Sequence, residues 1–239
     1  LWNKYNYSMS FDGVNDKIII PHHSNQVGMS ELSIMLWAKF DSYPNWQNSN
    51  GGHMLFEKHE HVGANANASY AVYTEYDYDA LRFDIQLDNG NSINLRMEPF
   101  SSHLLLNTWH HITGVYDGDF THIYFDGVLV GSSQTNSLGN IKNTNFPITM
   151  ADAFGNVDHW DGDLDNISLW NTALTQSEIQ NYMNCPPTGS ESGLAGYWNF
   201  EEGSGTTVYD QTVNGNNGTI NGATYDSNVP SQSCVGGLT

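Results

Sequence analysis

The chain has 239 residues, 38% of them hydrophobic, and its 26 acidic and 7 basic side chains give a formal net charge of -19. This length supports one large core, and the negative charge excludes nucleic acid and acidic membrane surfaces as partners. No apolar run approaches the roughly 20 residues that span a bilayer, so no membrane-spanning segment is expected. The chain starts at Leu1 rather than Met, and we expect a processed form or a piece of a longer protein.

Apolar stretches of strand length recur along the chain, each ended by Gly, Asn or Asp, whereas helical periodicity is nearly absent. The predicted strands in the first hundred residues are 8–11, 17–21, 32–40, 53–58, 70–75, 81–87 and 92–97. In residues 32–40 the apolar side chains alternate, and the other face, with Met35 and Trp37 among its members, is only partly polar. We therefore expect a central strand that is covered on both faces, with Trp37 packed rather than bound to ligand.

Turn sequences typical of hairpins lie at residues 88–91, 117–119 and 126–127, each between β-rich stretches. Parallel strands would need crossovers of about a dozen residues or more between them, which these short spacings do not allow. The hairpins therefore predict antiparallel neighbours. We infer an all-β, antiparallel two-sheet sandwich.

One segment, residues 175–183, has the pattern of a short helix. Thr175 and Glu178 form a capping box ahead of the apolar residues of this segment. A Pro-Pro pair then ends the helix, and the strand pattern resumes at Leu194 after a loop. The sandwich is thus expected to carry one short helix.

The chain contains two cysteines, Cys185 and Cys234, and neither has a histidine or another cysteine near it at zinc-site spacing. We therefore predict a disulfide. It would close a loop of about 50 residues, which the chain-entropy model values at roughly 4 kcal/mol. Such a bond implies an oxidising compartment, so the protein is expected to be secreted or to lie at the cell surface.

Four segments, residues 10–16, 107–118, 123–131 and 161–175, resemble the motifs of bacterial laminin G-like domains in the concanavalin A-like lectin/glucanase superfamily. They include two Phe-Asp-Gly sequences and the Asp-Gly-Asp-Leu-Asp strand ahead of the helix, and in order and spacing they cover residues 8–183. The resemblance implies a jelly-roll fold, here expected as a single domain over residues 1–239. It implies the fold more specifically than the ligand.

Residues 193–225 look like the segment that usually precedes the Phe-Asp-Gly strand in this family, but here that segment comes last. Either it opens a second, truncated repeat, or the domain is circularly permuted and the segment completes the same two sheets. We favour the permutation because Cys185 and Cys234 bracket the segment.

The resemblance also implies a structural calcium ion. In this family the Phe-Asp-Gly loop and the Asp-bearing strand often share one, which carries over to Asp12 and Asp165. Asp165 alternates with the apolar Ile167, so we expect a buried carboxylate that needs a partner. Asn15 and Asp163 are further candidate ligands, because calcium takes six to eight oxygen atoms. The alternative is that Asp12 only organises its turn.

Sugar binding is the first functional hypothesis that the resemblance raises. Aromatic rings would stack on the sugar and fixed polar groups would bind its hydroxyls. The candidate groups are Tyr43 with Trp46, Asp158 with His159 and Trp160, and Tyr73, Tyr76 and Tyr78 with Arg82 and Asp84. For each group the alternative is ordinary packing.

Other functions either fit the sequence less well or cannot be distinguished from sugar binding by sequence. A zinc site of His53, His59 and His61 near Glu57 is not enforced by their spacing. The retaining-glucanase motif Glu-x-Asp-x-x-Glu is approached at residues 75–79 but lacks its last Glu, so that activity is not expected. A polysaccharide-degrading enzyme of the same fold, with a different pair of carboxylates, is a less favoured alternative. A protein-binding adhesion module stays open as an alternative. We predict a non-catalytic, monomeric module that binds a polysaccharide or glycan and is tethered to other domains.

Overall fold

The computed structural model describes residues 7–43, 53–60, 67–75, 78–134, 139–152 and 159–234. Its strands form two sheets. Sheet A contains β1 (Ser8–Asp12), β3 (Leu32–Phe40), β8 (Trp109–Tyr116), β9 (Phe120–Phe125), β10 (Val128–Gln134), β12 (Asp161–Trp170), β13 (Leu194–Trp198) and β16 (Thr224–Asp226). Sheet B contains β2 (Lys17–Ile20), β4 (Met54–Glu60), β5 (Asn67–Glu75), β6 (Ala80–Gln86), β7 (Ser92–Met97), β11 (Ile148–Met150), β14 (Thr207–Val208) and β15 (Gly218–Asn221).

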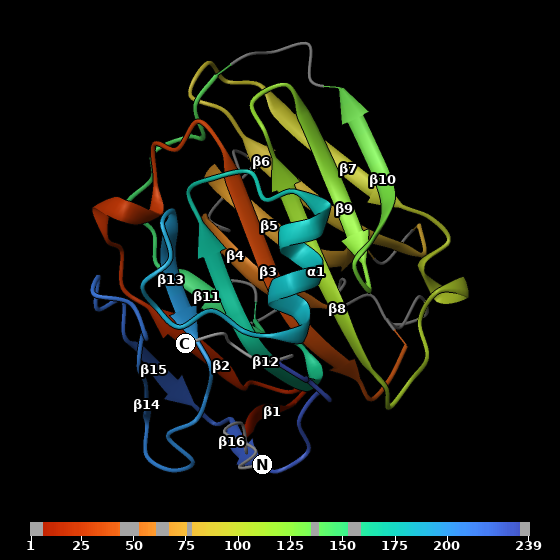
Figure 1. The fold of residues 1–239 in the computed structure, drawn as a ribbon, viewed down its shortest axis with the longest axis vertical. Helices are drawn as coiled ribbons and strands as arrows, with labels where there is room; N and C mark the ends of the chain where they lie inside the picture. The colour runs from red at the N-terminus through yellow and green to blue at the C-terminus, as the bar shows by residue number, and fades with distance from the viewer. Residues whose placement is uncertain are drawn as a thin grey trace.

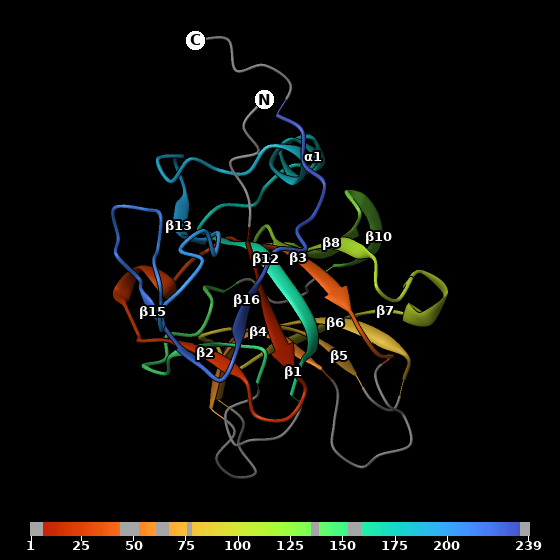
Figure 2. The same ribbon diagram turned by 90° about the horizontal axis from the view of Figure 1, so that it is seen from below.

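The two sheets are stacked face to face, as Figure 2 shows most directly. Sheet A has the order β10-β9-β8-β3-β12-β1-β16 with β13 beside β12, and sheet B has the order β14-β15-β2-β11-β4-β5-β6-β7. Each of the three predicted hairpin turns joins two antiparallel neighbours, β6 to β7, β8 to β9 and β9 to β10. The predicted all-β, antiparallel two-sheet jelly-roll sandwich is confirmed.

The main core lies between the sheets. Along β3 the side chains of Leu32 and every second residue up to Phe40 point into this core, as their alternation predicts. Fully buried aromatic residues from both halves of the chain fill it, among them Phe56, Trp160 and Trp198. Because aromatic side chains bury large apolar areas, these residues contribute much of the hydrophobic free energy of folding.

A second, smaller core covers the outer face of sheet A. The helix α1 (Gln176–Asn184) lies across this face, in front of β3 and β8 in Figure 1. Ile179 of the helix packs with Met35 of β3 and with Trp170, so β3 is covered on both faces as predicted. Thr175 and Glu178 form the expected capping box, and each accepts a backbone N–H of the other residue. None of the helices in the described ranges has the length and apolar character that a membrane span requires.

The predicted disulfide joins Cys185, at the end of α1, to Cys234, 49 residues later in the chain. It anchors residues 227–234, which we call the C-terminal strap, to the helix. Within the strap, Gln232 accepts a hydrogen bond from Asn166 on β12 at 2.9 Å and donates one to the carbonyl of Met183 at 2.9 Å. The strap therefore ties the helix to the outer face of sheet A.

The late segment, residues 193–225, enters both sheets. β13 pairs with β12 in sheet A, and β15 pairs with β2 in sheet B. The indole of Trp198 is fully buried and donates to the carbonyl of Asn216 at 2.8 Å. Residues from the end of the chain therefore pack in the same core as residues from its beginning.

Candidate functional site

Sheet registers bring several loops to one end of the sandwich. Phe40 lies opposite Gly162, Asp12 lies opposite Asp161, and Glu75 pairs with Ala80 across a hairpin. The segments that follow β1, β3 and β5, and the segment that precedes β12, therefore leave the sheets at the same end. We call it the loop end. Each of the three groups of predicted ligand residues has members in these segments, and Tyr73, Arg82 and Asp84 lie on the adjoining strands β5 and β6.

Tyr43 belongs to the segment after β3 and is 44% exposed. An aromatic ring that is this accessible at a loop has a face available for contact with a ligand. Its predicted companion Trp46 lies outside the described residues, as do Tyr76 and Asp158. Of the predicted pair Tyr43 and Trp46, the structure therefore describes Tyr43.

Tyr78 is the second exposed ring at the loop end. It precedes β6 and is 53% exposed. The guanidinium of Arg96, on the neighbouring strand β7, lies 4.2 Å from the centre of the ring. A cation over a phenol ring at this distance attracts it electrostatically and restrains its orientation. Tyr78 is thus an accessible ring that Arg96 helps to hold in place.

A network of polar side chains flanks Tyr78 on the outer face of sheet B. Tyr73 lies opposite Arg82 in the register of β5 and β6, and Asp84 points the same way as Arg82 because it is two residues along. The hydroxyl of Tyr73 donates to Asp84 at 2.8 Å, and Arg82 donates to Asp84 at 2.7 Å and to Glu75 at 2.6 Å. Tyr73, Arg82 and Asp84, three members of one candidate group, therefore lie on the same face of sheet B.

This network fixes the charge of Glu75. Burial acts to raise the pKa of its carboxyl, but hydrogen bonds from Arg96 and Arg82 and their positive charges outweigh burial, and the net result is a lowered pKa. Arg96 reaches Glu75 at 2.9 Å, and Arg82 is itself only 11% exposed. Arg82, predicted to contact the ligand, therefore acts inside the network and holds two carboxylates in place.

Trp160 is not a ligand-binding side chain, which corrects the prediction made for it. Its ring is fully buried and packs against Phe40 with a centroid distance of 4.4 Å and against His53 at 5.6 Å. A ring enclosed in this way has no face left for a sugar. Burial also lowers the pKa of His53 to about 4, so this histidine is neutral at physiological pH.

His159, next to Trp160, lies at the loop end but is engaged with protein groups. Its Nδ1 is 3.0 Å from a carboxylate oxygen of Asp152. The other oxygen of Asp152 accepts a hydrogen bond from the ammonium of Lys17 at 2.7 Å. Because Asp152 is fully buried, this triad holds the segment that enters β12 against β2.

The four residues predicted to bind calcium do not form one site. Asp12 lies opposite Asp161, and Asp165 is four residues further along β12, which at the rise of a strand is about 13 Å away. Ligand distances of about 2.3–2.6 Å rule out one ion between them. One oxygen of Asp12 accepts the backbone N–H groups of Val14 and Asn15, at 2.9 and 3.4 Å, so Asp12 organises its turn.

The environment of Asp165 also differs from the prediction. Asn166 has a positive φ of 47° and forms a bulge against β3, which shifts the alternation by one residue. Ile167 points into the main core, whereas Asp165 points to the outer face of sheet A. Asp165 is nevertheless fully buried, and burial raises the pKa of its carboxyl well above the usual range. The carboxylate of Asp163, on the same face, is paired with the ammonium of Lys39.

The described residues offer no alternative metal centre. In the ranges that the structure describes, no three His, Cys, Asp or Glu side chains are grouped to hold a metal ion. Of the histidines considered for zinc, His53 packs on Trp160, His59 lies 3.4 Å from a carboxylate oxygen of Glu57, and His61 is outside the described residues. The two described histidines, His53 and His59, therefore do not come together as zinc ligands.

A laminin G-like family model of the concanavalin A-like lectin/glucanases superfamily matches residues 12–180, which is more than half of the chain. The chain belongs to this superfamily. The match contains the Asp12 turn, most of both sheets and the first turns of α1. No curated protein matches the sequence.

Solved structures show the same superfamily fold. A proposed carbohydrate-binding protein from Bacteroides ovatus matches with a TM-score of 0.70 at 18% identity, over 93% of this chain and 60% of that one. An SAP-like pentraxin from Limulus polyphemus has a TM-score of 0.51 at 15% identity, over 78% and 85%. The binding domain of Paraclostridial Mosquitocidal Protein 1 has a TM-score of 0.53 at 18% identity, over 77% and 48%. At these identities the likeness shows the fold alone.

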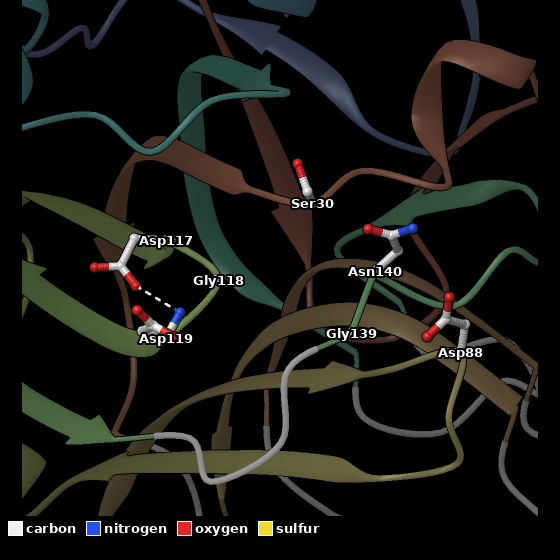
Figure 3. A pocket seen from close by; sticks show the side chains of 7 residues that line it. All are labelled: Ser30, Asp88, Asp117, Gly118, Asp119, Gly139 and Asn140. Atoms are coloured by element: carbon white, nitrogen blue, oxygen red, sulfur yellow. Dashed lines mark hydrogen bonds between the residues drawn. The ribbon is translucent and has the colours of Figure 1, made fainter.

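At the opposite end of this lectin-like sandwich lies a hollow of about 430 Å³, drawn in Figure 3. Its lining is Ser30, Asp88, Asp117, Gly118, Asp119, Gly139 and Asn140. Asp117 accepts the backbone N–H of Asp119 at 2.9 Å, which closes the β8–β9 turn. Sequence reasoning identified these aspartates only as turn residues, because nothing local shows that distant turns meet. The hollow has three carboxylates and no aromatic ring in its lining.

Proposed function

We propose that this chain is a non-catalytic carbohydrate-binding module whose ligand lies on the loop end of the sandwich. One observation carries the proposal: three segments that are far apart in the sequence meet at this end, and two of them present exposed tyrosine rings. Tyr43 and Tyr78 supply these rings. A structural match to a proposed carbohydrate-binding protein supports the same class of ligand.

The chemistry of the loop end suits a polyhydroxylated ligand. Exposed aromatic faces stack on the C–H surfaces of sugars, and polar groups of fixed orientation pair with the hydroxyl groups. Tyr73, Arg82 and Asp84 are held in fixed positions by their mutual hydrogen bonds. A rigid set of groups of this kind loses little entropy on binding, which favours recognition.

The state of Glu75 supports binding rather than hydrolysis through the incomplete glucanase motif. A glycosidase needs one carboxyl group with a raised pKa to protonate the leaving oxygen. Glu75, the nearest match to a glucanase motif, is held by Arg82 and Arg96, and its pKa is lowered. It is therefore a poor proton donor near neutral pH.

A second candidate function is contact with another protein, as in an adhesion module. Three aliphatic side chains at the loop end, Val14, Leu105 and Val128, are each more than half exposed. Exposed aliphatic groups are typical of surfaces that protein partners cover. This alternative predicts that glycans fail to bind while a protein partner does.

The disulfide supports a secreted or cell-surface location, because thiols are kept reduced inside most cells. The chain spans 60% of the length of the Bacteroides ovatus structure that it matches, and we propose that it acts as a monomeric module of a larger protein. The proposed glycan binding does not involve calcium. Binding of a calcium ion stays a prediction, and only for the Asp12 turn.

Binding to a glycan array, followed by calorimetry on each positive glycan, tests the proposal. We expect Tyr43→Ala and Tyr78→Ala each to weaken binding by about tenfold, since an aromatic contact is worth about 1.5 kcal/mol. Tyr209→Ala is the matched control, because Tyr209 is 52% exposed but lies beyond β14 on the opposite side from the loop end. Equal loss in all three variants, or no binding to any glycan, would overturn the proposal.

A further inference from the structure

We propose that the glycan bound at the loop end is uncharged, and that carboxylated and sulfated polysaccharides are excluded from it. This inference rests on the proposed function and specifies its ligand class. It follows from the pairing of every described basic side chain near that end.

Four basic side chains lie at the loop end, and each is neutralised by a carboxylate. Lys17 is 2.7 Å from Asp152, and Lys39 is paired with Asp163. On the outer face of sheet B, Arg82 is bound to Asp84 and to Glu75, and Arg96 is bound to Glu75. An anionic ligand that approaches such a pair meets a positive charge that is already balanced, and it is repelled by the bound carboxylate.

The remaining basic residues do not change this balance. The sequence contains seven Lys and Arg residues, so three remain. Lys58 is fully buried, and its ammonium donates to Gln26 and to the carbonyl of Phe146. Lys142 lies near the end of β6, on the side opposite to the loop end. The seventh is Lys4, which lies outside the described residues.

Three histidines at this end, His53, His110 and His159, are buried or lie beside a carboxylate. The low pKa of His53, about 4, keeps its ring neutral at physiological pH. His159 faces the carboxylate of Asp152, and His110 faces that of Asp126 at 2.9 Å. Each of these two rings therefore has an acidic neighbour within the protein.

Carboxylates at the loop end exceed the basic groups. Asp12 and Asp161 face each other across β1 and β12, and Glu98 is nearly half exposed beside Arg96. An anionic sugar placed here would lose its hydration and gain no unpaired cation, a loss that neutral hydroxyl groups do not suffer. The net charge of -19 adds long-range repulsion.

The test measures binding of the intact chain to a panel of neutral, carboxylated and sulfated polysaccharides. Pairs that share one backbone are included, such as dextran with dextran sulfate and hydroxyethyl cellulose with carboxymethyl cellulose. We expect binding within the neutral group only, with an affinity that changes less than about twofold between low and high salt. Binding to a sulfated or carboxylated glycan overturns the inference and leaves the proposed function standing. Silence across the whole panel overturns both.

A charge variant tests the cause. Glu75→Gln removes the carboxylate that neutralises Arg96, and we expect this variant to bind dextran sulfate, which wild type does not, with a gain of at least about tenfold, the effect of one charge-assisted hydrogen bond. Glu98→Gln is the matched control, because it changes the net charge equally but lies 4.0 Å from Arg96, outside the network. Equal gains in both variants would mean that total charge, and not ion pairing, sets the selectivity.

Discussion

Trp37 and Asp165 lie directly opposite each other in the register of β3 and β12. The indole Nε1 of Trp37 and the carboxyl Oδ2 of Asp165 are both buried, and neither has a hydrogen-bond partner among the described residues. Burial is the main cause of the raised pKa of Asp165, and the charge of Glu201 adds to it. The Oδ1 of Asp165 accepts the backbone N–H of Asn166 at 2.7 Å, but burial outweighs this hydrogen bond, and the folded protein favours the protonated acid.

This relationship predicts that Asp165→Asn stabilises the protein at alkaline pH. The pKa of Asp165 is higher in the folded than in the unfolded chain, so the free energy of unfolding falls as the pH rises from the unfolded value through the folded one. An amide has no such charge, and we expect a higher Tm than wild type at pH 8 and a smaller difference at pH 4. Asp163→Asn is the matched control and should lower the Tm, because it leaves the ammonium of Lys39 without its buried partner. Destabilisation by both variants would contradict the prediction.

Buried histidines predict a loss of stability in acid. Burial lowers the pKa of His53 to about 4 and that of His111 to about 3. Unfolded histidine titrates near 6.5, so the unfolded chain takes up protons first, and stability is lost as the pH falls from there towards the folded values. Each ring contributes roughly 1.4 kcal/mol per pH unit in this window.

Urea unfolding between pH 7 and pH 5 measures this effect. We expect His111→Gln to reduce the dependence of the unfolding free energy on pH by about 1.4 kcal/mol per unit relative to wild type. The control is His103→Gln, because His103 is exposed whereas His111 is buried. A slope that does not change in His111→Gln would show that this ring takes up protons equally in the folded and unfolded chains, which contradicts the lowered pKa.

The disulfide predicts a large change in stability on removal. Cys185→Ser with Cys234→Ser frees the C-terminal strap from α1, and the chain-entropy model gives a loss of roughly 4 kcal/mol. Chemical unfolding of both proteins, with and without a reductant, measures it. The reduced wild type should match the double variant. A loss below about 1 kcal/mol would mean that the strap's hydrogen bonds alone hold the strap in place.

We expect unequal losses in the free energy of unfolding when Arg82 and Arg96 are each changed to lysine. Arg82 is 11% exposed and binds Asp84 and Glu75, so a lysine there leaves a partly buried carboxylate without one of its donors, and we expect a loss of about 2 kcal/mol. Arg96 is 36% exposed, and Arg96→Lys should cost less than about 1 kcal/mol. The free energy of unfolding in urea compares the two. Similar losses would mean that exposure does not control the strength of these pairs.

Calcium remains a prediction, now confined to the Asp12 turn. We expect calcium to raise the Tm of wild type and of Asp165→Asn but not of Asp12→Ala, because Asp165 is too far from Asp12 to share its ion. Calorimetric titration with and without EDTA makes the measurement. If the titration shows no heat of calcium binding, the role of Asp12 is limited to organising its turn, where it accepts the N–H of Val14.

Several features followed from local sequence because their causes are local. The alternation in residues 32–40 predicted β3 with both its faces, and the capping box at Thr175 and Glu178 predicted the start of α1. Hairpin turns predicted their strand neighbours, since a turn fixes the register of the two strands that it joins. The two cysteines left one pairing within the chain, and that pairing formed.

Other features were decided only by the tertiary structure, because they depend on residues distant in sequence. The alternation that placed Asp165 with Ile167 holds only for an unbroken strand, and the bulge at Asn166 breaks it against β3. Trp160 follows a loop and has no strand period, so its burial depends on Phe40 and His53. The meeting of separate loops at one end is set by strand registers between residues more than a hundred positions apart, which no local pattern encodes.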